Sequence, residues 1–426
     1  MIDINLIREN PEEVKKAVVA KKLDVSVVDE VISLDEKRRS LIKETEDLRA
    51  QKNKYAGEKN IEEGKRVKEE LKKKEPELKR IENEFRETLY RIPNIIAPDV
   101  PQGKDENDNK VLRKWGEPTK FEFKARQHME LGETLDIIDI KTSGKVSGAR
   151  FNYLKGDAVL LQFALIQFVL QSLTDRETVG KIAKSVDNSL DTPFIPVVPP
   201  VIAKAEIMKK MDRFDPIDDR YYLEQDDALL IGSAEHTLGP LHMDEVIPEK
   251  NLPIRYLGYS TAFRREAGTY GKDTGGILRV HQFDKVEMES FSTPEQGDAE
   301  QKVMIAIQEY IMQQLKIPYQ VVILCTGDMG KPDYRQVDIE AWLPGQGKYR
   351  ETHTSDYMTD YQSRRLNTRY RSDGETGFVH MNDATAIAVG RTIIAILENY
   401  QQADGSIIVP EVLRRWVGKD KIAAKV

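Results

Sequence analysis

The chain has 426 residues, of which 39% are hydrophobic and 32% charged, and its formal net charge is −7. This composition predicts a soluble globular protein with two or three domains and at least one large core. It excludes a uniformly basic nucleic-acid binder, so any basic patch must be local. The single cysteine, Cys325, excludes an intramolecular disulfide and a cysteine-built zinc site. We expect a reducing, cytoplasmic location.

Neither a targeting segment nor a membrane span is expected. The first ten residues, MIDINLIREN, carry charges where a signal peptide needs its apolar core. The most apolar stretch, residues 158–173, is interrupted by Gln162, Gln167 and Gln171 and is short for a bilayer. It predicts a buried helix and no membrane partner.

Residues 27–92 show a heptad pattern in two segments. Leu34, Leu41, Leu48 and Tyr55 recur at intervals of seven, as do Leu71, Leu78, Phe85 and Ile92. The pattern is interrupted near residues 60–64, so it predicts two long helices folded back as an antiparallel coiled-coil arm. At roughly 30 residues per helix and about 1.5 Å per residue, the arm is about 45 Å long. Pro76 is expected to kink the second helix.

The distal half of this arm is basic. Residues 52–74 contain nine Lys or Arg and five Glu, so this segment has a net charge of +4 although the whole protein is acidic. A basic rod suits contact with a nucleic-acid backbone, which needs charge more than base-specific groups. A solvated coiled coil that mediates dimerisation or spacing is the alternative. The basic residues proposed for contact are Lys52, Lys54, Lys59, Lys65, Arg66, Lys72 and Lys73.

A stretch rich in Pro, Asp and Asn, residues 92–115, predicts a linker to a second domain. We place the domains at 1–110 and 111–426. In the second, helices are expected at 155–173, 203–211 and 298–314, and strands at 194–201, 319–326 and 336–343. Strands in succession without regular βα alternation favour an α+β domain with an antiparallel sheet flanked by helices. Prolines 199 and 200 restrict the 194–201 strand to an edge.

Residues 255–289 predict a long β-hairpin whose turn contains Gly271, Asp273, Gly275 and Gly276. Because side chains alternate along a strand, Arg264 and Glu266 share one face of the first strand. On the second strand, one face holds Arg279, His281, Phe283, Lys285 and Glu287. Guanidinium groups, a stacking ring and carboxylates suit a nucleotide triphosphate, although a solvated charged hairpin is the alternative.

A final helix is expected over residues 384–397, where Arg391 is the single charge in an apolar run. A buried guanidinium is costly without an anion, so Arg391 must meet a carboxylate or a ligand phosphate. No GxxxxGK[ST] loop occurs in the chain, so an ATP site needs another design.

Several strings in order along nearly the whole chain resemble the seryl-tRNA synthetase family of class II aminoacyl-tRNA synthetases. VVPPVI resembles motif 1, FRREAG with RVHQFDKVE resembles motif 2, and AVGRTIIAILENYQQADGSIIVPEVLR resembles motif 3. RQHMELGETLDIID and KVSGARFNYLKGD look like the entry to the family's catalytic domain, and the helical hairpin looks like its tRNA-binding arm. The resemblance implies the class II antiparallel sheet with flanking helices, an N-terminal tRNA-binding domain, and a homodimer with Pro200 at its interface.

The resemblance also implies a serine-tRNA ligase that uses ATP, Mg²⁺, L-serine and tRNA(Ser), with tRNA(Sec) left open and no DNA partner. Arg264, Arg391 and Glu351 are the implied catalytic residues. The implied ATP contacts are Arg264, Glu266, Arg279, Phe283, Glu351, Thr354 and Arg391, with Mg²⁺ at Glu351 and Thr354. The implied serine contacts are Ser233, Glu235, Arg264, Glu287, Asp383 and Thr385. No general base is expected, and His281 and His353 are interpreted as structural.

The chain departs from the family pattern at three places that the resemblance assigns to binding of the amino-acid substrate. Ser233 stands where the family usually has threonine, Thr352-His353-Thr354 replaces an Ile-Ser-Ser string, and Asp383 replaces an asparagine. An extra carboxylate there favours an ammonium group and repels a carboxylate. An enzyme for another small amino acid and a non-catalytic RNA-binding paralogue are therefore the alternatives.

Overall fold

The structure is a computed structural model that describes residues 1–267 and 275–424, and the chain forms two compact units, Met1–Ile96 and Ala97–Val426. Gly271 and Asp273, two residues of the expected turn, lie outside the described residues. The two units meet at Ile96, whereas the sequence pattern places a domain boundary after residue 110.

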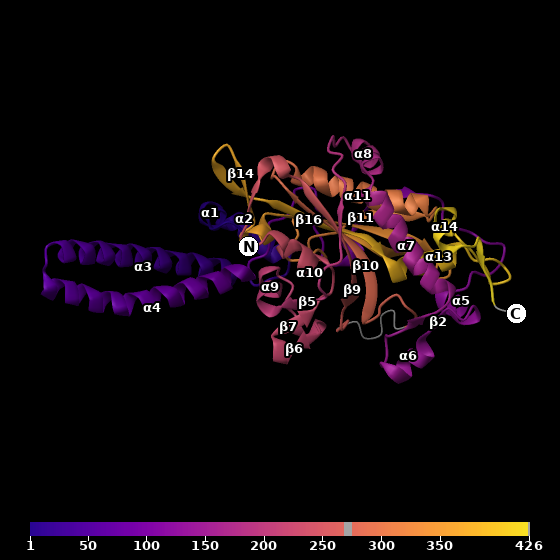
Figure 1. The fold of residues 1–426 in the computed structure, drawn as a ribbon, viewed down its shortest axis with the longest axis horizontal. Helices are drawn as coiled ribbons and strands as arrows, with labels where there is room; N and C mark the ends of the chain where they lie inside the picture. The colour runs from indigo at the N-terminus through magenta and orange to yellow at the C-terminus, as the bar shows by residue number, and fades with distance from the viewer. Residues whose placement is uncertain (268–274, 425–426) are drawn as a thin grey trace. The chain divides into compact units, whose positions relative to one another are not determined.

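The first unit is helical. Two long helices run side by side as the expected antiparallel arm (Figure 1). Asn60 caps the second of them, because its side-chain oxygen accepts a hydrogen bond from the Glu63 N–H at 3.3 Å. The heptad side chains Leu34, Leu41 and Leu71 are buried in the seam between the two helices. The helices of this unit are α1 (Ile4–Glu9), α2 (Pro11–Ala20), α3 (Ser26–Gly57) and α4 (Ile61–Arg91).

The helix α4 continues through Pro76. Pro76 is exposed. Water can therefore hydrate the backbone carbonyl that the missing N–H leaves without a partner.

The second unit is built on an eight-stranded sheet in the order β1-β11-β12-β13-β16-β10-β9-β4. Its strand pairs are antiparallel except β4 with β9, which is parallel, and β4 lies at an edge as its prolines predict. The fold is therefore the expected α+β arrangement. The strands are β1 (Lys110–Trp115), β4 (Ile195–Val197), β9 (Ile254–Phe263), β10 (Gln282–Ser292), β11 (Tyr319–Ile323), β12 (Arg335–Leu343), β13 (Lys348–Thr359) and β16 (His380–Ala388).

Helices cover the sheet. The helix α11 packs on β13 and β16, and α7 contacts α8, α13 and α14 (Figure 1). α7 is the described helix that is long and apolar enough to cross a membrane by length and composition, a test that core helices of soluble proteins also pass. Its buried residues include Leu161, Leu165 and Val169. The helices are α5 (His128–Thr134), α6 (Ile140–Val146), α7 (Asp157–Thr174), α8 (Arg176–Lys184), α9 (Ala205–Lys210), α10 (Glu235–Leu238), α11 (Gly297–Gln314), α12 (Tyr361–Leu366), α13 (Val389–Asn399) and α14 (Arg414–Val417).

Within the described residues, short strands form four further sheets around this core. They are β2 (Ile138–Asp139) with β3 (Tyr153–Leu154), β5 (Ile202–Lys204) with β7 (Ala228–Leu230) and β6 (Tyr222–Leu223), β8 (Val246–Pro248) with β14 (Arg369–Ser372) and β15 (Glu375–Phe378), and β17 (Ile407–Ile408) with β18 (Lys421–Ile422).

Three expectations about local structure were wrong. Residues 384–388 belong to strand β16, and the final helix starts at Val389. A short apolar run fits a buried helix and a doubly covered strand equally well, and only the neighbouring strands decide between them. Residues 110–115, expected in the linker, pair with β11 as an exposed edge strand.

The hairpin strands are also shorter than expected, because β9 ends at Phe263 and β10 begins at Gln282. Arg264, Glu266, Arg279 and His281 therefore lie in the connection between them. Glu266 has a φ of 51°, in the left-handed region, which interrupts strand alternation there.

Candidate functional site

A cavity of about 530 Å³ lies on the sheet where β10, β12, β13 and β16 run side by side. Every residue predicted to contact ATP, Mg²⁺ or serine lines this cavity, except Ser233. These residues are Glu235, Arg264, Glu266, Arg279, Phe283, Glu287, Glu351, Thr354, Asp383, Thr385 and Arg391. Ser233 is buried beside it and donates a hydrogen bond to Glu287 Oε2 at 3.2 Å.

At one end of the cavity, Arg264 lies over an aromatic ring. The Arg264 guanidinium carbon is 5.4 Å from the centre of the Phe283 ring, and its Nε donates to the Gly232 carbonyl at 3.0 Å. Arg279 pairs with Glu266 across the same end, with Nη1 3.1 Å from Oε2. The ring and the arginines therefore meet in the cavity although the residues at 264–281 do not form strands.

Arg391 and Glu351 form an ion pair that joins α13 to β13. Arg391 Nη1 donates to Glu351 Oε1 at 2.7 Å and to the Glu351 carbonyl at 3.1 Å. Partial desolvation inside the cavity favours the neutral acid, but the charges of Arg391 and Arg264 lower the pKa of Glu351 below its ordinary value. The sequence left open whether Arg391 meets a carboxylate or a ligand phosphate. In the structure it pairs with the carboxylate of Glu351, which itself lines the cavity.

Next to this pair, Asp338 presents a further carboxylate. Its Oδ1 is buried without a hydrogen-bond partner, and Thr354 hydrogen-bonds to its side chain. Burial and the neighbouring Glu351 raise the pKa of Asp338 well above its ordinary value. Two carboxylates and a hydroxyl, from Asp338, Glu351 and Thr354, offer the all-oxygen donor set that Mg²⁺ prefers.

The other half of the cavity is strongly acidic. Arg213 Nε donates a short hydrogen bond to Glu235 Oε1, and Lys285 makes a close ion pair with Glu287 Oε2. Burial opposes ionisation of Glu235, yet the Arg213 charge lowers the pKa of Glu235. For Glu287, burial outweighs the nearby Lys285 and raises the pKa. Glu235 is therefore held ionised more firmly than Glu287.

Three more carboxylates form a row across neighbouring strands. In the ladder, Glu289 of β10 faces Asp383 of β16, which in turn faces Asp356 of β13. Burial and the charges of neighbouring carboxylates raise the pKa values of Glu289, Asp383 and Asp356 well above their ordinary values. Like charges directly opposite each other destabilise a sheet, so this row needs a cation or shared protons.

The two histidines that we interpret as structural do not supply a base. Burial lowers the pKa of His353 to about 3, so its ring is neutral and a poor proton acceptor near neutral pH. The His281 ring packs against Phe151 at 5.3 Å between ring centres and does not line the cavity.

Sequence reasoning missed Arg213 and assigned no role to Asp338, Asp356 or Glu289. Strand alternation contains a signal for the last two, because Glu289 follows Glu287 by two residues and Asp356 follows Thr354 by two. Arg213 lies in an irregular segment after the short helix α9, so no periodic pattern in the sequence predicts that it lines the cavity.

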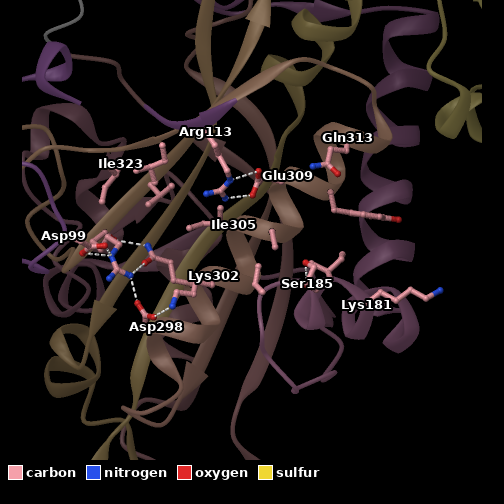
Figure 2. Close-up of a pocket in the computed structure, with 18 of the residues that line it drawn as sticks. Asp99, Arg113, Lys181, Ser185, Asp298, Lys302, Ile305, Glu309, Gln313 and Ile323 are labelled. Carbon is pink, nitrogen blue, oxygen red and sulfur yellow. Dashed lines mark hydrogen bonds and ion pairs between the residues drawn. The ribbon is translucent and has the colours of Figure 1, made fainter. Parts of the chain in front are cut away.

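A second, larger cavity of about 960 Å³ lies on the opposite face of the sheet between α8 and α11 (Figure 2). Along β12, Arg335 and Val337 line this cavity while Gln336 and Asp338 line the first, which places the two on opposite faces. Lys302 pairs with Asp298 and Arg113 pairs with Glu309 (Figure 2). Arg335 also pairs with Asp298. With its charges paired in this way, the second cavity has no arrangement that suggests a reaction.

Comparison with known proteins gives a consistent result. Residues 220–400 match the class II core domain of tRNA synthetases (G, H, P, S and T), and residues 1–96 match the seryl-tRNA synthetase N-terminal domain. The chain is 41% identical to the serine–tRNA ligase of Dictyoglomus turgidum over 441 residues, with 100% of both chains covered. It is 40% identical to that of Pyrococcus horikoshii over 459 residues, covering 99% of this chain and 97% of that one.

Solved structures agree. The crystal structure of seryl-tRNA synthetase from Pyrococcus horikoshii complexed with ATP matches with a TM-score of 0.91 and 38% identity, with 100% of both chains covered. The cytoplasmic serine-tRNA ligase from Naegleria fowleri in complex with AMP matches with a TM-score of 0.87 and 32% identity, covering 100% of this chain and 99% of that one.

The sheet, the cavity on it and the core-domain match define a class II aminoacyl-tRNA synthetase, an ATP-dependent ligase. The match to the family's N-terminal domain and the full-length identities narrow this class. The chain belongs to the seryl-tRNA synthetase family.

Proposed function

We propose that this chain activates L-serine with ATP to form seryl-adenylate and pyrophosphate, and then transfers the seryl group to the 3′ end of tRNA(Ser). The observation that carries the proposal is the meeting of Arg264, Phe283, Glu351 and Arg391 in one cavity. A decayed, non-catalytic paralogue has no reason to retain that set.

The end of the cavity around Phe283 binds ATP. The Phe283 ring stacks on adenine, and the Glu266 carboxylate accepts a hydrogen bond from the adenine amino group. Arg264 contacts the α-phosphate and Arg391 the γ-phosphate, where a planar guanidinium can donate two parallel hydrogen bonds to phosphate oxygens. Arg279 pairs with Glu266 at 3.1 Å and so orients that carboxylate.

Glu351 and Thr354 would hold Mg²⁺, since carboxylate and hydroxyl oxygens are the donors that this ion prefers. The neighbouring Asp338 Oδ1, a buried oxygen without a hydrogen-bond partner, offers a further donor of the same kind. When bound, Mg²⁺ neutralises phosphate charge as a Lewis acid. Glu351 also keeps Arg391 in position through its 2.7 Å hydrogen bond.

The acidic half of the cavity binds serine. Glu235 and Asp383 attract the ammonium group, while Glu287 and Thr385 accept and donate hydrogen bonds at the hydroxyl. Ser233 orients Glu287 through its 3.2 Å hydrogen bond. An acidic site that hydrogen-bonds to a substrate hydroxyl rejects analogues that lack it, because its polar groups are then left unpaired.

The reaction needs no general base. The serine carboxylate attacks the α-phosphate in line and pyrophosphate leaves. The terminal hydroxyl of the tRNA then attacks the adenylate carbonyl, the bond to the phosphate oxygen breaks, and AMP leaves with the hydroxyl proton on its phosphate. Arg264 and Arg391 contribute by position and by charge, which is sufficient for displacement at phosphorus. The neutral His353 takes no part in proton transfer.

The N-terminal unit binds tRNA through its arm, which is the role we assign to residues 1–110 in front of a catalytic domain at 111–426. The seven basic side chains proposed for contact, from Lys52 to Lys73, are exposed, which supports contact with phosphates. Replacing Lys65, Lys72 and Lys73 together by glutamate is expected to abolish tRNA charging and leave adenylate formation intact, while Lys250→Glu, on the exposed surface of the other unit, serves as the control. Equal loss of both activities would show that the arm acts structurally.

The catalytic unit forms a homodimer in the cytoplasm. Apolar side chains are exposed on β4, on the segment that follows it and on α7, which packs against β4. The exposed fractions are 51% for Ile195, 80% for Val198 and 55% for Phe163. Pro200 is exposed two residues after Val198 and belongs to the same interface. Contiguous apolar exposure of this kind marks interfaces.

The experiment that tests the function is ATP–pyrophosphate exchange without tRNA, with serine compared against threonine, alanine, glycine and cysteine. Exchange with serine well above the others is the expected result. Exchange with a different amino acid would transfer the function to an enzyme for that substrate, and its absence with all five would contradict the proposal.

A further inference from the structure

The neighbouring strands β13 and β16 pair along only part of their length. Of the pairs described between them, the one that joins Ser355 to Ala384 is the last, and the others lie toward Thr359 and Met381. Residues 348–354 are paired with β12 on their other side, and residues 385–388 with β10. The sheet therefore opens between β13 and β16 at residues that line the first cavity.

Each of the two strands has a bulge just beyond their last pair. Thr352 is the extra residue of β13 in its pairing with β12, and Ala386 is the extra residue of β16 in its pairing with β10. A bulge bends its strand and increases the local twist, and such bends are frequent next to active sites. Two bends on neighbouring strands separate them at this point.

One buried side chain bridges the opening. Nε2 of Gln308, on α11, donates hydrogen bonds to the Thr354 carbonyl at 2.8 Å and to the Thr385 carbonyl at 2.9 Å. Gln308 is 0% exposed and belongs to a helix that packs against β13 and β16. Burying an amide is costly unless it is hydrogen-bonded, and here both N–H donors go to the strand edges that face each other across the opening.

The two residues held in this way serve different substrates. Thr354 is assigned to ATP and Mg²⁺ and Thr385 to the serine hydroxyl, so the inference rests on the proposed function. Both residues line the first cavity. The serine carboxylate must meet the α-phosphate in line, and a misplacement of about 1 Å can cost about 10²-fold in rate. The gap between β13 and β16 therefore matters to the reaction.

We propose that Gln308 is a positioning residue for adenylate formation, because it sets the gap between β13 and β16 and with it the distance between bound ATP and bound serine. Gln308 is not among the residues that line the first cavity, so it acts through the two backbone carbonyls and touches neither substrate.

The same helix provides a matched control. Gln301 lies seven residues earlier, on the same face of α11, and is also 0% exposed. Its Nε2 donates to the carbonyls of Arg335 and Ser355, each at 3.1 Å. These two residues belong to β12 and β13 where the strands are paired, and neither lines the first cavity. Gln301 thus makes the same kind of bridge away from the substrates.

The test compares Gln308→Met and Gln301→Met with the wild type in ATP–pyrophosphate exchange, with kcat, KM for serine and KM for ATP measured separately. Methionine keeps the length of the side chain and removes both donors. Gln308→Met is expected to raise both KM values about two- to tenfold, the range of one ordinary hydrogen bond, and Gln301→Met is expected to leave both unchanged. A merely structural role would lower kcat with the folded fraction in both variants and leave KM unchanged.

Thermal melts on the same samples report the folded fraction. Gln308→Glu is a second test variant in case Gln308→Met fails to fold, because a carboxyl group has at most one donor for two carbonyls, and the same rise in KM is expected. Titration calorimetry of Mg·ATP without serine measures the Thr354 side alone. A wild type that binds Mg·ATP but does not exchange with serine would contradict the proposed function, while the comparison of ATP affinities would still test Gln308.

Three results would overturn the proposal. Unchanged KM values for both substrates in Gln308→Met would show that the bridge does not position them. A rise in one KM alone would show that Gln308 supports one substrate and does not set the distance between the two. An equal rise in Gln301→Met would mean that any lost bond beneath the sheet disturbs the cavity.

Discussion

Replacing Arg391 by alanine separates catalysis from stability. The Arg391 and Glu351 side chains are 21% and 45% exposed, so their 2.7 Å ion pair is partly screened by solvent. A pair of this kind contributes about 0–1 kcal/mol to folding. The guanidinium is expected to matter far more to adenylate formation, because losing one preorganised donor at developing charge costs about 2.7–4 kcal/mol, or about 10²–10³ in rate.

The assay is serine-dependent ATP–pyrophosphate exchange, with kcat and KM for ATP measured separately and thermal melts run on the same samples. Arg371→Ala is the matched control, because Arg371 is an exposed arginine on β14 outside the cavity. We expect a large fall in kcat/KM for Arg391→Ala, a change of a few degrees or less in its melting temperature, and no effect of the control.

Unchanged exchange in Arg391→Ala would refute the assignment of this residue to ATP. A fall in activity matched by a collapse of the melting temperature would instead mean that the pair with Glu351 is structural. Arg391→Lys refines the result, because lysine keeps the charge but not the planar fork, and we expect it to recover only part of the rate.

Three further predictions concern stability and assembly. Burial lowers the pKa of His353 to about 3, so the unfolded state takes up a proton first as the pH falls below about 6.5. The free energy of unfolding therefore falls by about 1.4 kcal/mol for each pH unit between about pH 6.5 and pH 3 because of His353. His353→Gln should make the free energy of unfolding fall less steeply between pH 7 and pH 4. An unchanged slope against pH would contradict this. Arg255→Met leaves Glu300, 0% exposed, without its ionic partner, and should cost about 3–5 kcal/mol in urea unfolding. The double change with Glu300→Met should recover most of that loss, and no recovery would mean that packing, not charge, is responsible. Val198→Asp should convert the dimer to monomers in analytical ultracentrifugation, and an unchanged mass would place the interface elsewhere.

Local pattern was sufficient for the elements whose signal is periodic. The heptads from Leu34 to Phe85 predict the paired helices, because one face of each helix must be covered along its whole length. Alternation from Val337 to Leu343 predicts β12, because one face is apolar. The same reasoning failed at residues 384–388, where a strand in the middle of the sheet is buried on both faces and the apolar residues show no clear period of two.

The sequence by itself therefore determined the family, the coiled-coil arm and the residue types at the ATP end, since these depend on short strings and on spacing along single elements. Only the tertiary structure decided that Arg213 meets Glu235 and that Glu289, Asp383 and Asp356 stand in one row across three strands. The physical reason is register. Which residues face each other across a sheet depends on how the strands are aligned, and neither strand contains that information alone.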